Sequence, residues 1–428
     1  MRVIADLHVH SRFSRATSER MSIEEIARFA KIKGLNLVGT GDFTHPRWLK
    51  ELQETLIPEP DSGLYRSVRN LDSPVHFMVT AEVCTIFTFE DEIRKIHHVI
   101  LTPSMETAFQ INDRLSKYGN LASDGRPTLS MDAPHLVEEV MEVSSENMVF
   151  PAHAWTPWFS IFGAFSGFNS VEECYQDMTS HIHALETGLS SDPPMNWRLS
   201  KLDRFALVSN SDSHSFWPWR IGREANVFDL DRMSYYEVVD AVRSKDKKRF
   251  KFTIETDPAY GKYHWTGHRN CNVALSSQDA VKLGNVCPVC RRKLTKGVEQ
   301  RVEELADRPV GFVSANAIGF MRLLPLSEII TAVLGVDSPS IQKVWNIYNS
   351  LIEKFGDEYT VLIDTSRDAL NAVVDGKIAE VIVRVREGQA KVAPGYDGVY
   401  GRLLLSEEGL VDAMVSRRVQ QRNLTDFM

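Results

Sequence analysis

The sequence contains no apolar run as long as the roughly 18 residues that a membrane-spanning helix requires. Its first residues, MRVIADLH, become polar too soon for a secretory signal peptide. We therefore expect a cytoplasmic protein with no membrane segment. Apolar residues make up 43% of the chain and charged residues 25%, which is the usual balance of a globular protein.

Cysteine is scarce, with five residues in 428. Cys84 and Cys174 are isolated in apolar surroundings, where we expect buried and inert thiols. The other three, Cys271, Cys287 and Cys290, cluster in one segment and are candidate metal ligands.

The chain also lacks an excess of positive charge, because its net charge is −8. That value alone argues against a general nucleic-acid binder. The charge is uneven, however: between Arg243 and Lys296 there are thirteen Lys and Arg against four Asp and Glu. A basic module on an acidic body suits a protein that meets a polyanion with one face. A small, loop-rich module with a solvated basic surface would give the same pattern.

A length of 428 residues is long for one hydrophobic core and indicates two or three domains. Residues 1–245 alternate short apolar runs with helical patterns, which predicts parallel β/α units. Six or seven such units would close into a barrel. Residues 246–310 lose this rhythm and predict a small metal-bound module, and residues 311–428 are expected to be mainly helical. The predicted barrel strands are 3–7, 35–39, 75–81, 99–101, 148–151, 182–185 and 205–209.

Several helix boundaries carry their own signals. Ser22 and Glu25 have the spacing of a capping box, and Gly34 ends the helix predicted over 22–33. Ser170 and Glu173 form a second capping box, and further helices are predicted over 133–143 and 341–355. The segment 377–392 fits either a hairpin or a helix.

Histidines and carboxylates fall at the ends of the predicted strands. Residues two apart in a strand point the same way, so His8 and His10 can converge on one ion, as can Asp212 and His214. Strand ends of a β/α barrel ring one mouth, where active sites form. A mixture of imidazole and carboxylate suits Zn, Mn or Fe, and Glu82 could bridge two ions. The candidate ligands are His8, His10, Asp42, Glu82, His98, His153, Asp212 and His214.

This ligand pattern resembles the PHP family (polymerase and histidinol phosphatase), whose motifs are an opening Asp-Leu-His-x-His, a Glu, two separated His and a closing Asp-x-His. The resemblance implies an α/β fold, a distorted (β/α)7 barrel, with two or three divalent metals such as Zn, Mn or Mg. The chain departs from the family at Ala16, where a His is frequent. It departs again at Thr40-Gly41-Asp42, where Thr-Asp-His is usual and His45 follows later. At both positions the chain lacks a histidine that the family has, and this affects whether a third metal site is present.

Longer runs are similar to the endonuclease Q family within this class, from the barrel through the cysteine-rich module. The matching runs are GTGDFTHP (39–46), PAHAWTPW (151–158), ETGLSSDP (186–193), SNSDSH (209–214), GKYHWTGHRNC (261–271), CPVC (287–290) and VEELADR (302–308). The resemblance implies a DNA repair endonuclease that cuts on the 5′ side of uracil, hypoxanthine, xanthine or an abasic site. Deaminated DNA would then be its partner.

The cysteine-rich module has the ligands of a structural zinc site. His268-x2-Cys271 and Cys287-x2-Cys290 are two half-sites separated by a loop, a spacing typical of closed tetrahedral zinc. His264 competes with His268, but the two-residue gap from His268 to Cys271 matches the other half-site.

Tryptophans lie close to the ligand motifs. An enzyme that reads a damaged base holds it out of the stack against aromatic surfaces, although these side chains could equally fill the barrel rim. The candidates are Trp155, Trp158, Trp197, Trp217 and Trp219.

We assign the chemistry to Glu82, Asp212 and Asp192. Asp192 could orient water or bind metal, or it could cap the helix that Pro193-Pro194 begins. The alternatives to a lesion-directed endonuclease are a small-molecule phosphatase of the PHP class and a non-catalytic DNA-binding scaffold.

Overall fold

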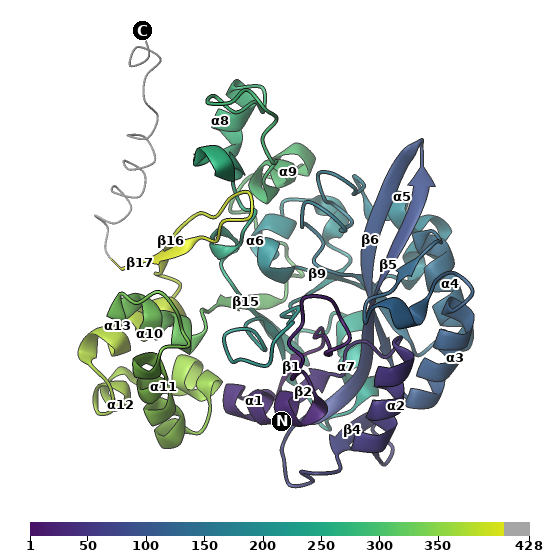
Figure 1. Cartoon of the computed structure of the whole chain (residues 1–428), viewed down its shortest axis with the longest axis horizontal. Coiled ribbons are helices and arrows are strands. Elements are labelled where there is room, and N and C mark those ends of the chain that lie inside the picture. The colour runs from purple at the N-terminus through teal and green to yellow at the C-terminus, as the bar shows by residue number, and fades with distance from the viewer. Residues whose placement is uncertain (406–428) are drawn as a thin grey trace.

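The computed structural model describes residues 1–405, and Figure 1 shows their arrangement. A barrel-like α/β body carries a small module and a helical C-terminal region. The strands that follow one another round the body are β1 (Arg2–Asp6), β2 (Leu37–Gly39), β5 (His76–Phe89), β6 (Glu92–Thr102), β8 (Met148–Pro151), β9 (Ala184–Glu186) and β10 (Ala206–Val208).

One hydrophobic cluster takes side chains from every one of these strands. It includes Ala5, Leu37, Met78, Val99, Phe150, Ala184 and Ala206. Hydrogen bonds join the strand ends as well. The amide of Ala154, after β8, donates to the oxygen of Glu186 in β9 (2.8 Å), and Val9, after β1, bridges to Ser213, after β10. The α/β fold class is therefore confirmed.

The strands are not all parallel. β1 pairs with β2, β2 with β5 and β9 with β10 in parallel. β5 and β6, however, form one long antiparallel hairpin, and β6 also runs antiparallel to β8. This hairpin replaces one of the expected crossover helices, and it fixes which histidines of β6 face the barrel mouth.

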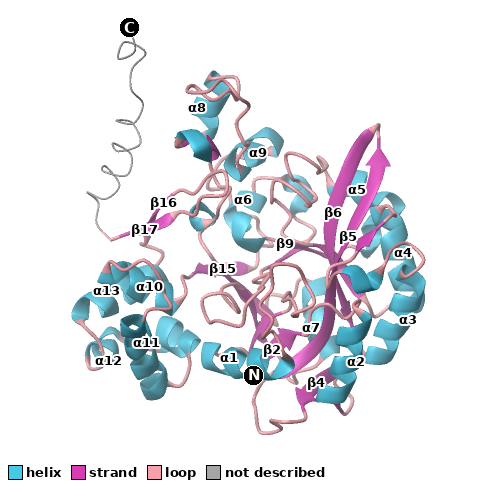
Figure 2. Ribbon diagram, in the orientation of Figure 1, coloured by secondary structure: helices cyan, strands magenta, loops and turns pink. Residues whose placement is uncertain are grey.

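Helices cover the outer face of the body (Figure 2). They are α1 (Ile23–Lys33), α2 (Pro46–Thr55), α3 (Met105–Leu115), α4 (Ala133–Val143), α5 (Val171–Tyr175) and α7 (Tyr235–Arg243). The capping signals act as expected. Ser22 accepts from the amide of Glu25, Ser170 accepts from that of Glu173, and Gly34 ends α1 with φ +95°.

Further strands widen the sheet on both sides. β11 (Ala225–Asp229) and β12 (Phe250–Glu255) continue it from β1 in antiparallel pairs. β15 (Gly319–Arg322) then pairs in parallel with β12, so a strand from the C-terminal part of the chain belongs to the barrel sheet. On the other side lie β3 (Leu56–Glu59), β4 (Leu64–Ser67) and β7 (Thr128–Leu129).

The small module projects from the body and has a core of its own, made by Val273, Ala280, Cys287 and Leu294. Its elements are β13 (Thr266–His268), β14 (Val273–Leu275) and α8 (Ser277–Lys282), and α9 (Val298–Leu305) follows them.

The C-terminal region is helical, as predicted. It contains α10 (Leu326–Leu334), α11 (Gln342–Phe355), α12 (Arg367–Asn371) and α13 (Gly376–Arg386), then β16 (Lys391–Ala393) and β17 (Arg402–Leu404). The segment 377–392 is thus a helix up to Arg386, and a strand begins at Lys391. The last part of the predicted domain 311–428 lies outside the described residues. Among residues 1–405, no helix combines the length and the apolar character needed to cross a membrane.

Candidate metal centre

Four side chains from three segments converge at the barrel mouth. His8 and His10 follow β1, Glu82 lies in β5, and Asp212 follows β10. Each offers one ligand atom, and these atoms all lie within 4.8 Å of one another. Glu82 Oε2 is 3.4 Å from His8 Nε2 and 3.2 Å from His10 Nε2, and Asp212 Oδ1 is 3.0 Å from His10 Nε2.

The other oxygen of Glu82 belongs to a second group. Glu82 Oε1 lies 2.8 Å from His97 Nδ1 and 3.1 Å from His153 Nε2. Glu82, His97 and His153 again offer ligand atoms within 4.8 Å of one another. One carboxylate therefore faces two ligand groups, which is the geometry expected of a residue that bridges two ions.

His97, rather than the predicted ligand His98, is the histidine of β6 that faces Glu82. In the β5–β6 hairpin Glu82 stands opposite Val99, and Cys84, two residues on and on the same face, stands opposite His97. His98 stands opposite Val83, on the other face. There it contacts the hydroxyls of Thr85 (2.9 Å) and Tyr175 (2.8 Å), and burial lowers its pKa to about 3.

Two carboxylates behind the centre hold the first histidines in place. Asp42 Oδ1 is 2.9 Å from His10 Nδ1, and Glu186 Oε2 is 3.0 Å from His8 Nδ1. In each ring the opposite nitrogen, Nε2, is thereby turned toward the centre. Asp42 was predicted to be a ligand, whereas Glu186 was not among the predicted site residues.

Asp42 is committed elsewhere, because its Oδ2 accepts from the amide and the hydroxyl of Ser11 (both 2.6 Å) and from Ser14. Gly41 stands in the second motif, and the backbone there leaves no room for a side chain. A Cβ at Gly41 would lie 2.2 Å from the backbone oxygen of Val9, and the backbone there has φ +64°. Only glycine fits that approach. His45 packs on Phe13 at the start of α2.

His214 lies beside the first group rather than in it. Its ring centroid is 4.3 Å from that of His10, and its Nδ1 is 3.0 Å from the backbone oxygen of Asp212. Among the described residues, the ligand groups at the mouth contain His8, His10, Glu82, His97, His153 and Asp212.

The charges of the centre favour a bound cation. Burial alone would raise the pKa of the Glu82 carboxyl, but His97, Arg126 and His8 hold it well below its usual range. Burial lowers the pKa of His97 to about 4, so that ring is neutral and can act as a ligand. Among residues 1–405, no atom forms a hydrogen bond with the buried Nε2 of His8. An unsatisfied imidazole nitrogen beside two carboxylates fits a divalent metal.

Arg126 is a residue that sequence reasoning missed. Its Nη1 lies 3.0 Å from Glu82 Oε2, and the side chain is 26% exposed. It therefore stands at the rim of the centre, where it can meet an incoming anion. No local motif marks it, because it comes from the irregular segment before β7.

Asp192 does not join either ligand group of the described residues. Its side chain accepts from the amide of Met195 (3.1 Å) and so caps α6 (Pro193–Asn196), and its Oδ2 pairs with the guanidinium of Arg322. The capping alternative is the one that these contacts support, and a catalytic role for Asp192 stays a prediction.

Three of the candidate tryptophans serve packing. Trp155 is buried against Phe162 and donates its indole N–H to Asn196 (2.8 Å). Trp217 and Trp219 stack with centroids 5.1 Å apart, and both contact Trp345 of α11. Trp219 also lines a cavity with Arg220.

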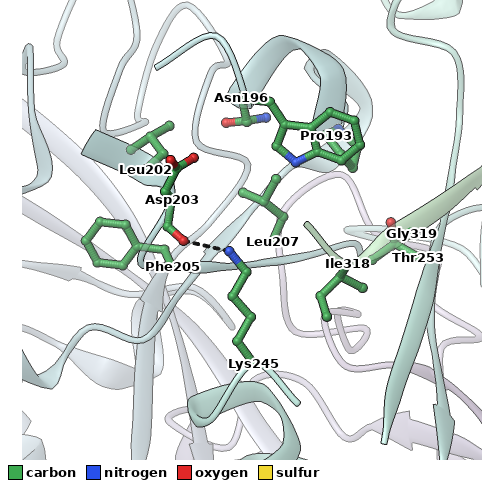
Figure 3. A pocket seen from close by; sticks show the side chains of 11 residues that line it. Pro193, Asn196, Leu202, Asp203, Phe205, Leu207, Lys245, Thr253, Ile318 and Gly319 are labelled. Atoms are coloured by element: carbon green, nitrogen blue, oxygen red, sulfur yellow. Dashed lines mark hydrogen bonds between the residues drawn. The ribbon is translucent and has the colours of Figure 1, made fainter. Parts of the chain in front are cut away.

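Trp197 lies away from the metal ligands. It packs edge to face on Phe320 of β15 and lines a small cavity between α6, β10 and β15. Figure 3 shows this cavity, in which the ammonium of Lys245 donates to the backbone oxygen of Asp203 (2.7 Å). None of the predicted metal ligands lines it.

Trp158 is 40% exposed and stacks on Phe165. Its neighbour Phe159 was not among the predicted residues, and it lies against His97. The Phe159 ring lies 5.0 Å from that of His97, it is 36% exposed, and its backbone has φ +60°. A bulky residue in this conformation is a strained outlier of the kind found at functional sites.

The cysteine-rich module holds the third ligand group. His268, Cys271, Cys287 and Cys290 offer ligand atoms within 4.8 Å of one another, and Cys290 Sγ is 3.3 Å from His268 Nδ1. His264 is not in this group, and its buried Nδ1 has no hydrogen-bond partner within the described part of the chain. Three thiols and one imidazole suit a closed tetrahedral site.

Similarity to known proteins covers the whole chain. Residues 325–389 match the family model described as the MJ0043 C-terminal domain. The uncharacterised protein MJ0043 of Methanocaldococcus jannaschii is 32% identical over 255 residues, which cover 59% of this chain and 31% of that protein. This chain therefore corresponds to about a third of MJ0043. The uncharacterised protein YqxK of Bacillus subtilis is 27% identical, over 94% of this chain and 99% of its own length.

Two solved structures are similar from end to end. The lesion-specific endonuclease PfuEndoQ of Pyrococcus furiosus is 33% identical with a TM-score of 0.84, over 100% of this chain and 98% of that one. Endonuclease Q in complex with a 27-mer duplex substrate, with an abasic lesion at the active site, is 34% identical with the same TM-score, over 96% and 98%. With this identity over nearly the full length of a solved relative, the chain belongs to the endonuclease Q family of DNA endonucleases.

Proposed function

We propose that this protein cuts DNA on the 5′ side of deaminated bases, namely uracil, hypoxanthine and xanthine, and of abasic sites. The observation that carries the proposal is Glu82, which faces two ligand groups at once in a chain similar over its whole length to endonuclease Q. A shared carboxylate suits a two-metal displacement at phosphorus.

Divalent ions, whether Zn, Mn or Mg, would polarise the phosphoryl group and lower the pKa of the attacking water. The side chains of the protein would bind the ions and position the phosphate. His8, His10, His97, His153, Glu82 and Asp212 would hold the ions, with Asp42 and Glu186 fixing the ring orientations. Arg126, 26% exposed beside Glu82, would contact a phosphate oxygen and balance its charge.

The basic module would grip the DNA backbone. Lys282, Arg291, Arg292 and Lys293 are exposed on it, and a zinc ion at His268, Cys271, Cys287 and Cys290 would keep it folded. The predicted division into a barrel (1–245), a zinc module (246–310) and a helical region (311–428) stays a prediction, and β12 and β15 of the barrel sheet lie beyond residue 245. Binding should weaken by roughly 0.9 log unit per contacted phosphate for each tenfold rise in salt.

The alternative of a small-molecule phosphatase gains no support from the basic module, since a small ester needs no such surface. The deciding experiment compares an end-labelled uracil duplex with p-nitrophenyl phosphate, each with added Mn or Mg. We expect a single cut 5′ to the uracil that leaves a 3′-hydroxyl upstream. A cut 3′ to the uracil, release of the free base or equal cutting of undamaged duplex would contradict the proposal.

A further inference from the structure

Glu186, the last residue of β9, contacts both ligand groups at the barrel mouth. Its Oε1 and Oε2 lie 3.1 and 3.0 Å from Nδ1 of His8, which belongs to the first group. Its Oε2 also accepts from the backbone amide of His153 (2.7 Å), which belongs to the second group. One buried carboxylate outside the ligand groups therefore holds a residue of each.

The contact with His153 acts on a strained backbone. His153 has φ +30°, in the left-handed region that residues with a side chain rarely adopt. Such a conformation persists only where the surrounding structure holds it. The Glu186 carboxylate supplies part of that support through the His153 amide. A shift of Glu186 would therefore displace the ring of His153 as well as that of His8.

Asn210 holds the carboxylate of Glu186 from behind. It lies two residues beyond β10, and its Nδ2 donates to Glu186 Oε1 (2.8 Å). Its Oδ1 accepts from the backbone amide of Leu7 (2.9 Å), the residue before His8, and from Nδ2 of Asn226 in β11 (2.9 Å). The side chains of Glu186, Asn210 and Asn226 are all buried, so these hydrogen bonds do not compete with bulk water.

The partners of Asn210 determine which way its amide faces. The backbone amide of Leu7 only donates, so it requires the oxygen, and the Glu186 carboxylate accepts, so it requires the nitrogen. Asn226 is fixed in turn by Ser209, whose amide donates to Asn226 Oδ1 (3.0 Å) and whose backbone oxygen accepts from Asn226 Nδ2 (2.8 Å). Asn210 cannot rotate without leaving a buried polar group unpaired, and it therefore presents one fixed donor to Glu186.

We propose that Asn210 is a positioning residue that acts through Glu186 on both metal sites, a role that rests on the two-metal centre of the proposed function. A side chain that orients metal ligands changes metal affinity by about 10- to 100-fold although it touches no ion. Asn210 stands one contact further from the ions than Glu186, so its loss should weaken binding by about tenfold. Because Glu186 holds His8 and His153, both sites should weaken together.

The test titrates Mn²⁺ into the full chain after dialysis against EDTA and follows the EPR signal of the free ion. Mn²⁺ is chosen because the thiolates of the cysteine-rich module disfavour it. Asn210→Asp keeps the acceptor for Leu7 but replaces the donor toward Glu186 by an oxygen, and it should raise both dissociation constants at least about tenfold. Glu186→Ala should raise them by up to about 100-fold. Adding Asn210→Ala to Glu186→Ala should change them by less than about threefold, because the residue on which Asn210 acts is already gone.

Asn147→Ala is the matched control. Asn147 is also a buried asparagine, it donates to the backbone oxygen of Val140 (2.8 Å), and it lies at the opposite end of β8 from His153. This variant should lower the melting temperature and leave Mn²⁺ affinity unchanged.

Unchanged affinity in Asn210→Asp, weakening of one site only, or losses that multiply in the double variant would each overturn the role of Asn210 and leave the proposed function standing. A wild type that binds fewer than two Mn²⁺ ions would overturn the two-metal centre of the proposed function, and the role of Asn210 with it.

Discussion

Lys33 and Glu358 form a buried ion pair, with Lys33 Nζ 2.7 Å from Glu358 Oε1. Lys33 ends α1 of the barrel, and Glu358 follows α11 in the C-terminal region. Glu358 also accepts from the amide of Leu326 (2.9 Å) and from the hydroxyl of Tyr348 (2.8 Å). A buried ion pair, in which both carboxylate oxygens of Glu358 accept hydrogen bonds, thus joins two parts of the chain more than 300 residues apart.

Removing one partner of this pair should destabilise the protein strongly. We expect Lys33→Met to cost about 3–5 kcal/mol in the free energy of unfolding, because the Glu358 carboxylate is left buried without its cation. Lys31→Met, on the exposed side of the same helix, should cost less than about 0.5 kcal/mol. Urea unfolding of both variants measures the difference. Equal values would show that the pair contributes nothing.

The choice of His97 over His98 as a ligand can be tested with neighbouring substitutions. His97→Ala should lower metal content per chain and reduce cutting by at least about 100-fold, as should His8→Ala, Glu82→Gln and Asp212→Ala. His98→Ala should lower the melting temperature, since it removes the contacts with Thr85 and Tyr175. It should keep its metal. Metal content from elemental analysis, compared with the melting curves of the same variants, separates a metal ligand from a structural histidine. Loss of metal in His98→Ala would support the sequence prediction that His98 is a ligand.

The cysteine-rich module should lose zinc when its ligands are replaced. Cys287→Ser and Cys290→Ser should each release about one zinc per chain, because a closed site needs all four ligands. DNA affinity should then fall more than turnover of p-nitrophenyl phosphate. His264→Ala is the control, because His264 lies outside the ligand group and should leave the zinc in place. Unchanged zinc in both cysteine variants would refute the site.

Stability should decline between about pH 5 and pH 8, because two carboxyls are buried together. Burial raises the pKa of Glu255 to about 8 and, with the neighbouring Glu255, raises that of Glu224. Over this window the unfolded chain releases protons that the folded chain retains, so the free energy of unfolding falls as pH rises. Glu255→Gln cannot ionise and should show a shallower decline of melting temperature with pH. A decline as steep as that of the wild type would exclude Glu255 as its source.

Much of the barrel could be predicted because its signals are local. The helix at Ala133–Val143 and the strand at Met148–Pro151 have the predicted bounds, since cap, periodicity and apolar run agree there. The convergence of His8, His10 and Asp212 also follows the prediction, because two residues separated by one position at a strand end point the same way.

The structure differs from the predicted arrangement where segments distant in the sequence decide which side chains meet. Whether His97 or His98 faces Glu82 depends on the register of the β5–β6 hairpin, which neither strand encodes alone. The tryptophans were grouped by their nearness in sequence to ligand motifs. Trp217 and Trp219 are instead turned toward Trp345, more than a hundred residues away. Arg126 and Phe159 lie in irregular segments, where periodicity carries no information.

The pairing of β15 with β12 determines how the chain can be divided. A fragment that stops at residue 310 would keep every predicted barrel ligand but lose β15. The backbone N–H and C=O groups of Phe252 to Glu255 would then form an open edge. Unpaired edges of this kind recruit strands from other molecules. The barrel by itself should therefore self-associate, and a growing chain would be exposed to aggregation until synthesis has passed residue 322 and β15 can pair with β12.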